Sequence, residues 1–242
     1  MVTYACYTNP GNRPINEDAV GVQVKGDDLC FVVCDGLGGH GMGDEASCFV
    51  KDFFLSAFSQ TEKADTEFIE RCFLDSQASL SEIQKEKKLQ DKMKTTCVCL
   101  TVQGKKTHIG YVGDSRLYAF GNKTVKYQTK DHSVPYMLYL SKQIPYEEIR
   151  NHSDRNLLLR VMGTEWDEPK HETHKAMPLR KFRAFLLCTD GFWELITEEK
   201  MCQYLQSASN VEEWLNAMVL EVQKNGTKKE MDNYSAIAIF CK

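Results

Sequence analysis

The side chains with the clearest potential for chemistry are acidic residues that stand next to predicted β-strands. Apolar runs end in Asp35-Gly36, in Gly113-Asp114-Ser115-Arg116 and in Asp190-Gly191, and the motifs Asn16-Glu17-Asp18 and Asp232-Asn233 precede two further strands. A single Asp-Gly pair is usually a turn signal. Five acidic motifs at strand edges instead predict that the carboxylates converge on one rim, provided that the strands align in one or two sheets.

Such a cluster of carboxylates needs a counter-charge. Carboxylates that are held together repel one another, so some must be protonated or a cation must lie between them. Oxygen ligands without His or Cys suit Mn²⁺ and Mg²⁺. Two such ions about 3.5–4 Å apart can share and acidify a water molecule and clamp a phosphoryl oxygen. Arg13, four residues before Glu17, could hold that phosphate with two hydrogen bonds.

A glycine-rich segment offers a competing interpretation. Residues 36–41 read Gly-Leu-Gly-Gly-His-Gly after a predicted strand, which satisfies the G-x-G-x-x-G pattern of dinucleotide-binding loops. However, the carboxylate of Asp35 would repel a pyrophosphate, and the pattern also requires an acidic residue about 20 positions later. Residues 55–60 continue a helical pattern and contain no acidic residue. The context therefore favours a metal site over a dinucleotide site.

Three weaker signals are interpreted as structural. The segment from His171 to His174 is similar to a truncated zinc-protease motif, but its histidines are three apart and the segment is predicted as a strand or loop. Thr95 and Thr96 precede a strand and are taken as ordinary strand residues rather than support for a site. The ten cysteines contain no Cys-x-x-Cys pair and lie mostly in apolar runs, which is typical of reduced core thiols.

The composition is that of a globular protein. The chain has 242 residues, of which 42% are hydrophobic and 26% charged, and its net charge is −4. We expect a single domain over residues 1–242. The acidic balance argues against nucleic acid as a partner, and the longest apolar runs are too short to span a membrane. No signal peptide is recognisable, and no appended sensor or anchor is expected, so the predicted location is cytoplasmic.

Hydrophobic periodicity predicts the elements that would position the acidic residues. Helices are expected at 45–59, at 66–89 and from a capping box at Asn210 and Glu213 to Asn225. Strands are expected at 20–24, 29–34, 96–102, 107–112, 116–120, 124–127, 171–176, 185–189 and 235–241. The polar stretch 131–163 contains only short helical pieces, at 135–140 and 146–150. This order predicts an α+β fold with stacked, mainly antiparallel sheets covered by helices.

Taken in order, the motifs resemble the metal-dependent serine/threonine protein phosphatases of the PPM or type 2C family, most closely its bacterial branch. The matching series is Arg13, Asn16-Glu17-Asp18, Asp35-Gly36-Leu37-Gly38-Gly39-His40, Thr95-Thr96, Gly113-Asp114-Ser115-Arg116, Asp131-His132-Ser133, Asp190-Gly191 and Asp232-Asn233-Tyr234-Ser235. The resemblance covers roughly residues 3 to 241, and residues 131–163 match the flap of the family.

The resemblance implies a central β-sandwich flanked by helices, with two Mn²⁺ or Mg²⁺ ions at one end. The metal ligands implied are Glu17, Asp18, Asp35, Gly36, Asp190 and Asp232, with Asp114 and Asp190 at a third metal site near the flap. Asp35 would bridge both core ions, Asp18 would act through water, and Arg13 would orient the phosphate. A metal-bridging hydroxide would attack phosphorus directly, without a phosphoenzyme.

Two departures from the family pattern concern the chemistry. Leu37 stands where many eukaryotic members carry a histidine proposed as the general acid, and His40 has no assigned role. Glu194 occupies the position where an aspartate often completes the third metal site. The implied partners are phosphorylated proteins and a cognate serine/threonine kinase, and a monomer is expected. The alternatives are a catalytically weak module that binds phosphoproteins or a kinase, and a hydrolase of small phosphoesters.

Overall fold

Two antiparallel β-sheets stacked face to face form the centre of the protein. The structure is a computed structural model that describes residues 2–38, 42–89, 92–227 and 230–241. The five-stranded sheet has the order β1 (Val2–Asn9), β11 (Tyr234–Cys241), β10 (Ala184–Cys188), β7 (Arg116–Phe120) and β8 (Val125–Gln128). The second sheet has the order β2 (Asp18–Lys25), β3 (Asp28–Leu37), β5 (Cys97–Gln103), β6 (Lys106–Val112) and β9 (Glu172–Pro178), with β4 (Lys94–Thr95) paired to β3.

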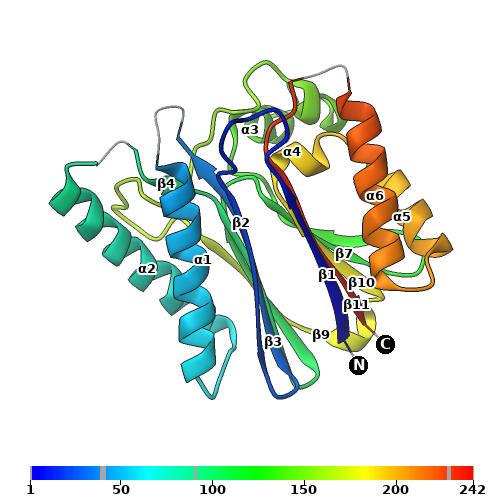
Figure 1. Cartoon of the computed structure of the whole chain (residues 1–242), viewed down its shortest axis with the longest axis horizontal. Coiled ribbons are helices and arrows are strands. Elements are labelled where there is room, and N and C mark those ends of the chain that lie inside the picture. Colours follow the sequence, from blue (N-terminus) through cyan, green and yellow to red (C-terminus); the bar gives the residue numbers. More distant parts are fainter. Residues whose placement is uncertain (1, 39–41, 90–91, 228–229, 242) are drawn as a thin grey trace.

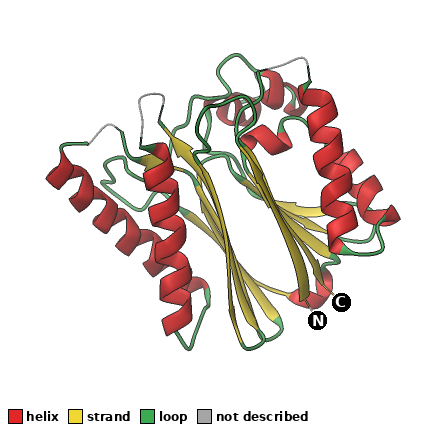
Figure 2. Ribbon diagram, viewed as in Figure 1, coloured by secondary structure: helices red, strands yellow, loops and turns green. Residues whose placement is uncertain are grey.

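Helices cover the outer face of each sheet (Figures 1 and 2). The six-stranded sheet carries α1 (Gly43–Gln60) and α2 (Thr66–Lys87), and the five-stranded sheet carries α5 (Glu198–Ser207) and α6 (Val211–Gly226). Two short helices, α3 (Val134–Leu140) and α4 (Asp190–Trp193), and 3₁₀ turns at Tyr146–Asn151 and Leu179–Lys181 complete the described structure. The predicted α+β sandwich is therefore confirmed.

Three apolar layers hold the sandwich together. Phe31 and Leu187 pack between the two sheets, Phe54 and Phe73 pack between the six-stranded sheet and its helices, and Trp214 packs against the five-stranded sheet. All five side chains are fully buried, and burial of this much aromatic and aliphatic surface drives folding. Within the described ranges, no helix combines the length and the apolar character needed to cross a membrane.

Most elements of more than four residues lie where the periodicity placed them, with two exceptions. The strand β1 was not predicted, because it is a half-buried edge strand in which apolar and polar residues do not alternate cleanly. The helix α5 was also missed, since its ten residues are largely polar. It starts at Glu198, after the N-cap residue Thr197, whose side chain accepts a hydrogen bond from the backbone N–H of Lys200. The predicted start of α6 is confirmed, because the backbone N–H of Glu213 donates to Asn210 Oδ1 at 2.8 Å.

The cysteines behave as the sequence predicted. All ten are free, and seven of them are buried. Cys30 and Cys99 lie on neighbouring strands with their sulfur atoms 3.9 Å apart in the layer beneath α1 and α2. Burial raises the pKa of the Cys99 thiol well above its ordinary value, so it stays protonated and acts as a small apolar side chain.

Candidate metal centre

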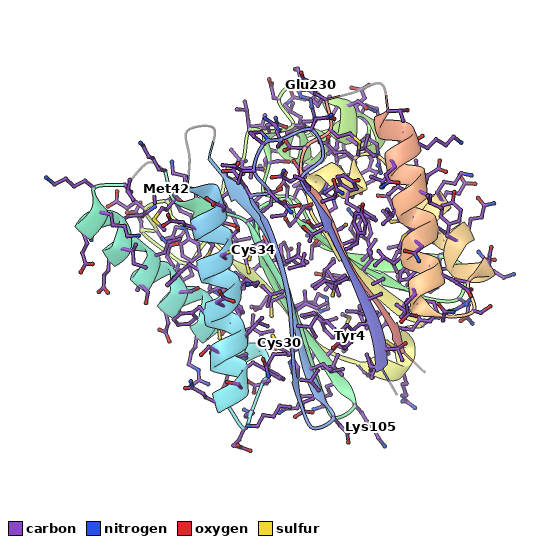
Figure 3. The ribbon with its side chains drawn as sticks, viewed as in Figure 1. Tyr4, Cys30, Cys34, Met42, Lys105 and Glu230 are labelled. Atoms are coloured by element: carbon purple, nitrogen blue, oxygen red, sulfur yellow. The ribbon has the colours of Figure 1, made fainter. Side chains whose placement is uncertain are left out.

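The predicted acidic residues meet in one cavity of about 270 Å³ at one end of the sandwich. Its lining includes Arg13, Glu17, Asp35, Gly36, Asp114, Asp190 and Asp232. These residues come from the loop before β2, the end of β3, the β6–β7 turn, the start of α4 and the loop before β11. In Figure 3 this end of the molecule is marked by Glu230, which lines an adjoining cavity together with Arg13, Asp190 and Asp232.

Asp18 lies just beneath this cavity. It stands directly opposite Asp35 in the antiparallel pairing of β2 with β3. The Thr189 hydroxyl donates to Asp18 Oδ2 at 3.0 Å, whereas Oδ1 is buried and has no hydrogen-bond partner among the described residues. Burial and the negative charges of Asp190 and Asp232 raise the pKa of Asp18 to about 7. A buried carboxylate oxygen without a partner is suited to a metal ion or to a water molecule bound to one.

Asp35 is held by the two threonines that the sequence had suggested were merely structural. The Thr95 hydroxyl donates to the Asp35 carbonyl oxygen at 2.9 Å, and the Asp35 backbone N–H donates to Thr96 Oγ1 at 3.0 Å. Thr96 Oγ1 also lies 2.7 Å from the Ser115 hydroxyl, next to Asp114. The interpretation of Thr95 and Thr96 as ordinary strand residues was therefore wrong, since both fix the backbone that presents Asp35.

The loop that carries Glu17 is tied to the other end of the chain by Asn233. The Glu17 backbone N–H donates to Asn233 Oδ1 at 2.8 Å, and Asn233 Nδ2 donates to the carbonyl oxygens of Pro10 and Ile15. The Glu17 carboxylate lies against the first turn of α1, where a Cβ on Gly43 would come 2.6 Å from Oε1. Asn233 is a positioning residue that the sequence placed in a motif without a role.

Arg13 and Asp232 form an ion pair at the mouth of the cavity. Arg13 Nε donates to Asp232 Oδ1 at 3.0 Å, and Nη2 donates to Oδ2 at 2.8 Å. Both side chains remain about half exposed, at 58% and 44%. The arginine that we expected to bind phosphate is thus paired with an expected metal ligand. Because both side chains are half exposed, each of them can exchange this partner for another.

The carboxylates are strongly coupled through their charges. Burial raises the pKa of Asp35 and of Asp114 well above the ordinary value, and the charge of Asp190 raises both further. Burial and nearby Asp44 raise the pKa of Glu17, while burial and Asp232 raise that of Asp190. Each of these shifts expresses the cost of gathering negative charge in a buried place. Divalent cations would remove that cost, and the donor set consists entirely of hard oxygen atoms.

The side chains alone do not form a complete ligand shell. Among the described residues, no three His, Cys, Asp or Glu side chains lie together in a group that could hold a metal ion. Backbone oxygen and water would have to complete such a shell, and Gly36, which lines the cavity, could contribute its carbonyl oxygen. A Cβ at Gly36 would come 2.2 Å from the Gly43 carbonyl oxygen, so only glycine allows this close approach.

Asp114 is supported by an arginine whose role the sequence did not reveal. The indole Nε1 of Trp193 donates to the Asp114 carbonyl oxygen at 3.0 Å, and the guanidinium of Arg116 lies 3.4 Å from the centre of the Trp193 ring. Arg116 in turn pairs with Asp131 through two hydrogen bonds of 2.8 and 2.6 Å. Arg116 and Asp131 both lie within the motifs quoted above, so the sequence contained a pointer to this pair although it did not reveal the pairing.

The segment from 131 to 163 contributes to the cavity, as its irregular pattern had suggested. Asn156 and Leu158 line the cavity together with Leu37 and Gly38. Sequence reasoning assigned no role of their own to Asn156 and Leu158, since neither residue carries titratable chemistry. His40 and the end of the glycine-rich segment, residues 39–41, lie outside the described residues.

The segment from His171 to His174 is not part of this centre. His171 stacks between Phe73 and Trp166, and Glu172 begins β9, where it accepts a hydrogen bond of 2.7 Å from the Tyr111 hydroxyl. His174, within β9, packs edge-on against the Tyr127 ring instead, so the two histidines contact different side chains. The interpretation that this segment is structural is consistent with these contacts.

Together the sandwich and its oxygen-lined cavity define a metal-dependent hydrolase that acts on phosphate esters. The model of the family Protein phosphatase 2C matches residues 11–234, so the chain belongs to the protein phosphatase 2C family. The serine/threonine phosphatase stp of Listeria monocytogenes is 30% identical over 236 residues, which cover 94% of this chain and 90% of that protein.

Solved structures agree with this assignment. Serine/threonine phosphatase Stp1 from Staphylococcus aureus matches with a TM-score of 0.91 at 28% identity, covering 100% of this chain and 96% of that one. The catalytic domain of PstP in complex with two manganese ions has the same fold, with a TM-score of 0.81 at 21% identity and coverage of 99% and 97%. The chain is a metal-dependent protein phosphatase, and neither a weak binding module nor a small-phosphoester hydrolase is supported by these relatives.

Proposed function

We propose that this phosphatase hydrolyses phosphoserine and phosphothreonine in proteins, with Mn²⁺ or Mg²⁺ as its cofactor. The observation that carries the proposal is the single cavity in which Arg13 meets Glu17, Asp35, Asp190 and Asp232. The names of the relatives from Listeria and Staphylococcus support serine and threonine as the side chains from which phosphate is removed. We also propose that residues 1–242 form one catalytic domain, in which residues 131–163 form a flap.

The metal assignment rests on the positions of the oxygen donors. Asp35 and the Gly36 carbonyl would hold one ion, Asp190 and Asp232 would hold the other, and Asp35 would be shared. Glu17 and Asp18 would act directly or through water, and Asp114 with Asp190 would form a third site near Glu194. Bound divalent ions would activate a water molecule and neutralise the charge of the phosphoryl oxygens.

The chain's own residues would bind and orient the substrate. Arg13 can rotate from Asp232 to the phosphate, because both partners are half exposed and a bidentate pair suits a carboxylate and a phosphate equally. Leu37, which lines the cavity where a histidine acid would otherwise stand, cannot supply a proton. The serine or threonine oxygen, which leaves phosphorus as an alkoxide, would therefore take its proton from water.

A second cavity next to the first is suited to the polypeptide around the phosphorylated residue. It has a volume of about 500 Å³ and shares Arg13, Asn156, Asp190 and Asp232 with the first cavity. Arg150 and Arg155 from the flap also line it. We expect phosphorylated proteins as substrates, a cognate serine/threonine kinase as the enzyme that supplies them, and a monomer that does not use nucleic acid as a partner and acts in the cytoplasm.

The test is phosphate release from a phosphothreonine peptide with and without Mn²⁺. We expect turnover that requires the metal and that falls by about a hundredfold or more in Asp190→Asn, because a metal ligand is lost. The matched control is Asp75→Asn on the exposed side of α2, which should retain full activity. Undiminished turnover in Asp190→Asn would refute the assignment, and preferential cleavage of a nucleoside monophosphate would refute the substrate class.

A further inference from the structure

A basic cavity lies at the end of the sandwich opposite to the acidic rim. It has a volume of about 760 Å³ and is formed by the β7–β8 turn, the residues that lead into β10 and the end of β11. Strand direction places it there, because β10 runs from Ala184 toward Asp190 and β11 runs away from Asp232 toward Cys241. Figure 3 labels Lys105 at this end, and the Leu179 backbone N–H donates to the Lys105 carbonyl oxygen at 2.9 Å.

Among the described residues that line this cavity, five are basic and none is acidic. The basic residues are Lys123, Lys126, Arg180, Lys181 and Arg183. None of them forms an ion pair with any residue of the described chain. The protein has 34 acidic residues for 30 lysines and arginines, so a shortage of acidic residues does not explain their absence here. Five cations gathered without counter-ions repel one another, which is a cost unless a ligand supplies the opposite charge.

Neutral donors and backbone geometry add to the positive charge. Asn122 and Thr124 also line the cavity, and their side chains form no hydrogen bond with the described residues. A Cβ at Gly121 would come 2.7 Å from Lys126 Cε, so the glycine makes room for the stem of that lysine. The cavity therefore combines charged and uncharged donors with a local backbone that accommodates one of the cations.

Protection of a sheet edge accounts for only part of this arrangement. β8 is the edge strand of its sheet, and a lysine such as Lys126 on an edge strand discourages pairing with other chains. Arg180, Lys181 and Arg183, however, lie in the 3₁₀ turn and the residues before β10, which is an interior strand of that sheet. Edge protection gives no reason for those three cations to face the same cavity.

We propose that the basic cavity binds a small anion that carries several phosphate groups in a row. Arginine and lysine side chains together are the usual recognition groups for clustered phosphates, and a concave surface of one sign of charge concentrates the field on such a ligand. The volume suits a small molecule. Nucleic acid is disfavoured because the protein has a net charge of −4, whereas binding to a nucleic-acid backbone needs an extended basic stripe.

Inorganic tripolyphosphate is the probe, titrated calorimetrically into the protein in the presence of EDTA. Without metal, the acidic rim repels the anion, so binding reports on the basic cavity. The triple variant Lys123→Ala, Arg180→Ala, Lys181→Ala removes three exposed cations and should bind about tenfold more weakly or worse. The matched control, Lys85→Ala, Lys92→Ala, Lys224→Ala, removes three exposed lysines elsewhere and should bind as the wild type does. Raising NaCl from about 50 to about 200 mM should weaken wild-type binding.

Several results would overturn this proposal. Equal affinity of the wild type and the triple variant would refute the site, as would the absence of any binding heat. Tighter binding of a single-stranded oligonucleotide or of an acidic peptide through the same three side chains would refute the ligand class. Phosphopeptide hydrolysis by the triple variant should stay unchanged, so failure of this proposal is distinguishable from failure of the proposed catalytic function.

Discussion

Arg116 and Asp131 form a two-bond ion pair that is almost completely buried, with side-chain exposures of 1% and 2%. Arg116 begins β7, and Asp131 lies at the start of the flap, so the pair fastens the flap to the five-stranded sheet. The guanidinium stacks on Trp193, which in turn holds the Asp114 carbonyl oxygen. The pair thus ties residues 131–163 to the sheet and, through Trp193, supports the Asp114 wall of the acidic cavity.

Replacement of Asp131 by Asn should destabilise the protein strongly. It leaves the Arg116 guanidinium buried, with the Glu198 carboxylate at 3.6 Å as its nearest remaining counter-charge. Loss of one partner from a buried pair typically lowers the free energy of unfolding by about 3–5 kcal/mol. Urea denaturation measures this, and Glu62→Gln, which breaks the exposed pair with Lys25, should cost less than about 1 kcal/mol. Equal losses in the free energy of unfolding in the two variants would show that the buried pair contributes no more to stability than the exposed pair does.

Replacement of Arg13 by Ala should separate stability from function. Because the pair with Asp232 is half exposed, the free energy of unfolding should change by less than about 1 kcal/mol. The kcat/KM for a phosphothreonine peptide should fall about tenfold or more, since a bidentate phosphate contact is lost. Calorimetry should show Mn²⁺ binding that is as tight as in the wild type or tighter, because Asp232 no longer has a competing partner. Weaker Mn²⁺ binding would mean that Arg13 holds Asp232 in place for the metal.

Replacement of Gly36 by Ala should disrupt the metal site. The added methyl group would come 2.2 Å from the Gly43 carbonyl oxygen and 2.6 Å from the Glu17 carbonyl oxygen, and neither backbone atom can move freely. We expect a loss of about 1–3 kcal/mol in the free energy of unfolding and more than tenfold weaker Mn²⁺ binding. In the control, Gly21→Ala, the atoms nearest to the new methyl group belong to the side chains of Leu55 and Lys51 and not to the backbone, so Mn²⁺ affinity should be retained. An unchanged Mn²⁺ affinity in Gly36→Ala would contradict the role of this backbone.

The sequence predicted the acidic rim well, because carboxylates at strand ends depend only on chain order and strand register. It could not predict the contacts that fix their backbone, since Thr95, Thr96 and Asn233 act through hydrogen bonds between distant segments. The partner of Arg13 was equally hidden, as Asp232 lies 219 residues away in the chain. β1 was missed for a related reason. Its residue pattern does not indicate a strand, and it is held in the sheet by its pairing with the distant strand β11.

A pH dependence of stability is expected from His132. The Gly113 backbone N–H donates to His132 Nδ1 at 3.1 Å, so Nε2 carries the proton and faces Glu172 Oε1 at 3.2 Å. Burial lowers the pKa of His132 below its ordinary value of 6.5, although Glu172 acts in the opposite direction. The unfolded chain therefore binds a proton that the folded chain does not. Its contribution to stability is complete above about pH 6.5 and is lost as the pH falls toward the lowered pKa.

The variant His132→Asn isolates this contribution, because its amide oxygen can still accept from Gly113 and cannot be protonated. The measured quantity is the difference in the free energy of unfolding between wild type and variant, followed from pH 7.5 to pH 5.5. For one proton, this difference changes by at most about 1.4 kcal/mol per pH unit. His108 and His171, whose pKa values burial also lowers, are present in both proteins and cancel in the difference. The pKa of Glu172 is lowered from 4.5, so its carboxylate titrates below this window. As the pH falls, the free energy of unfolding of the wild type should decrease relative to that of the variant. A difference that stays constant across the range would show that His132 keeps an ordinary pKa in the fold.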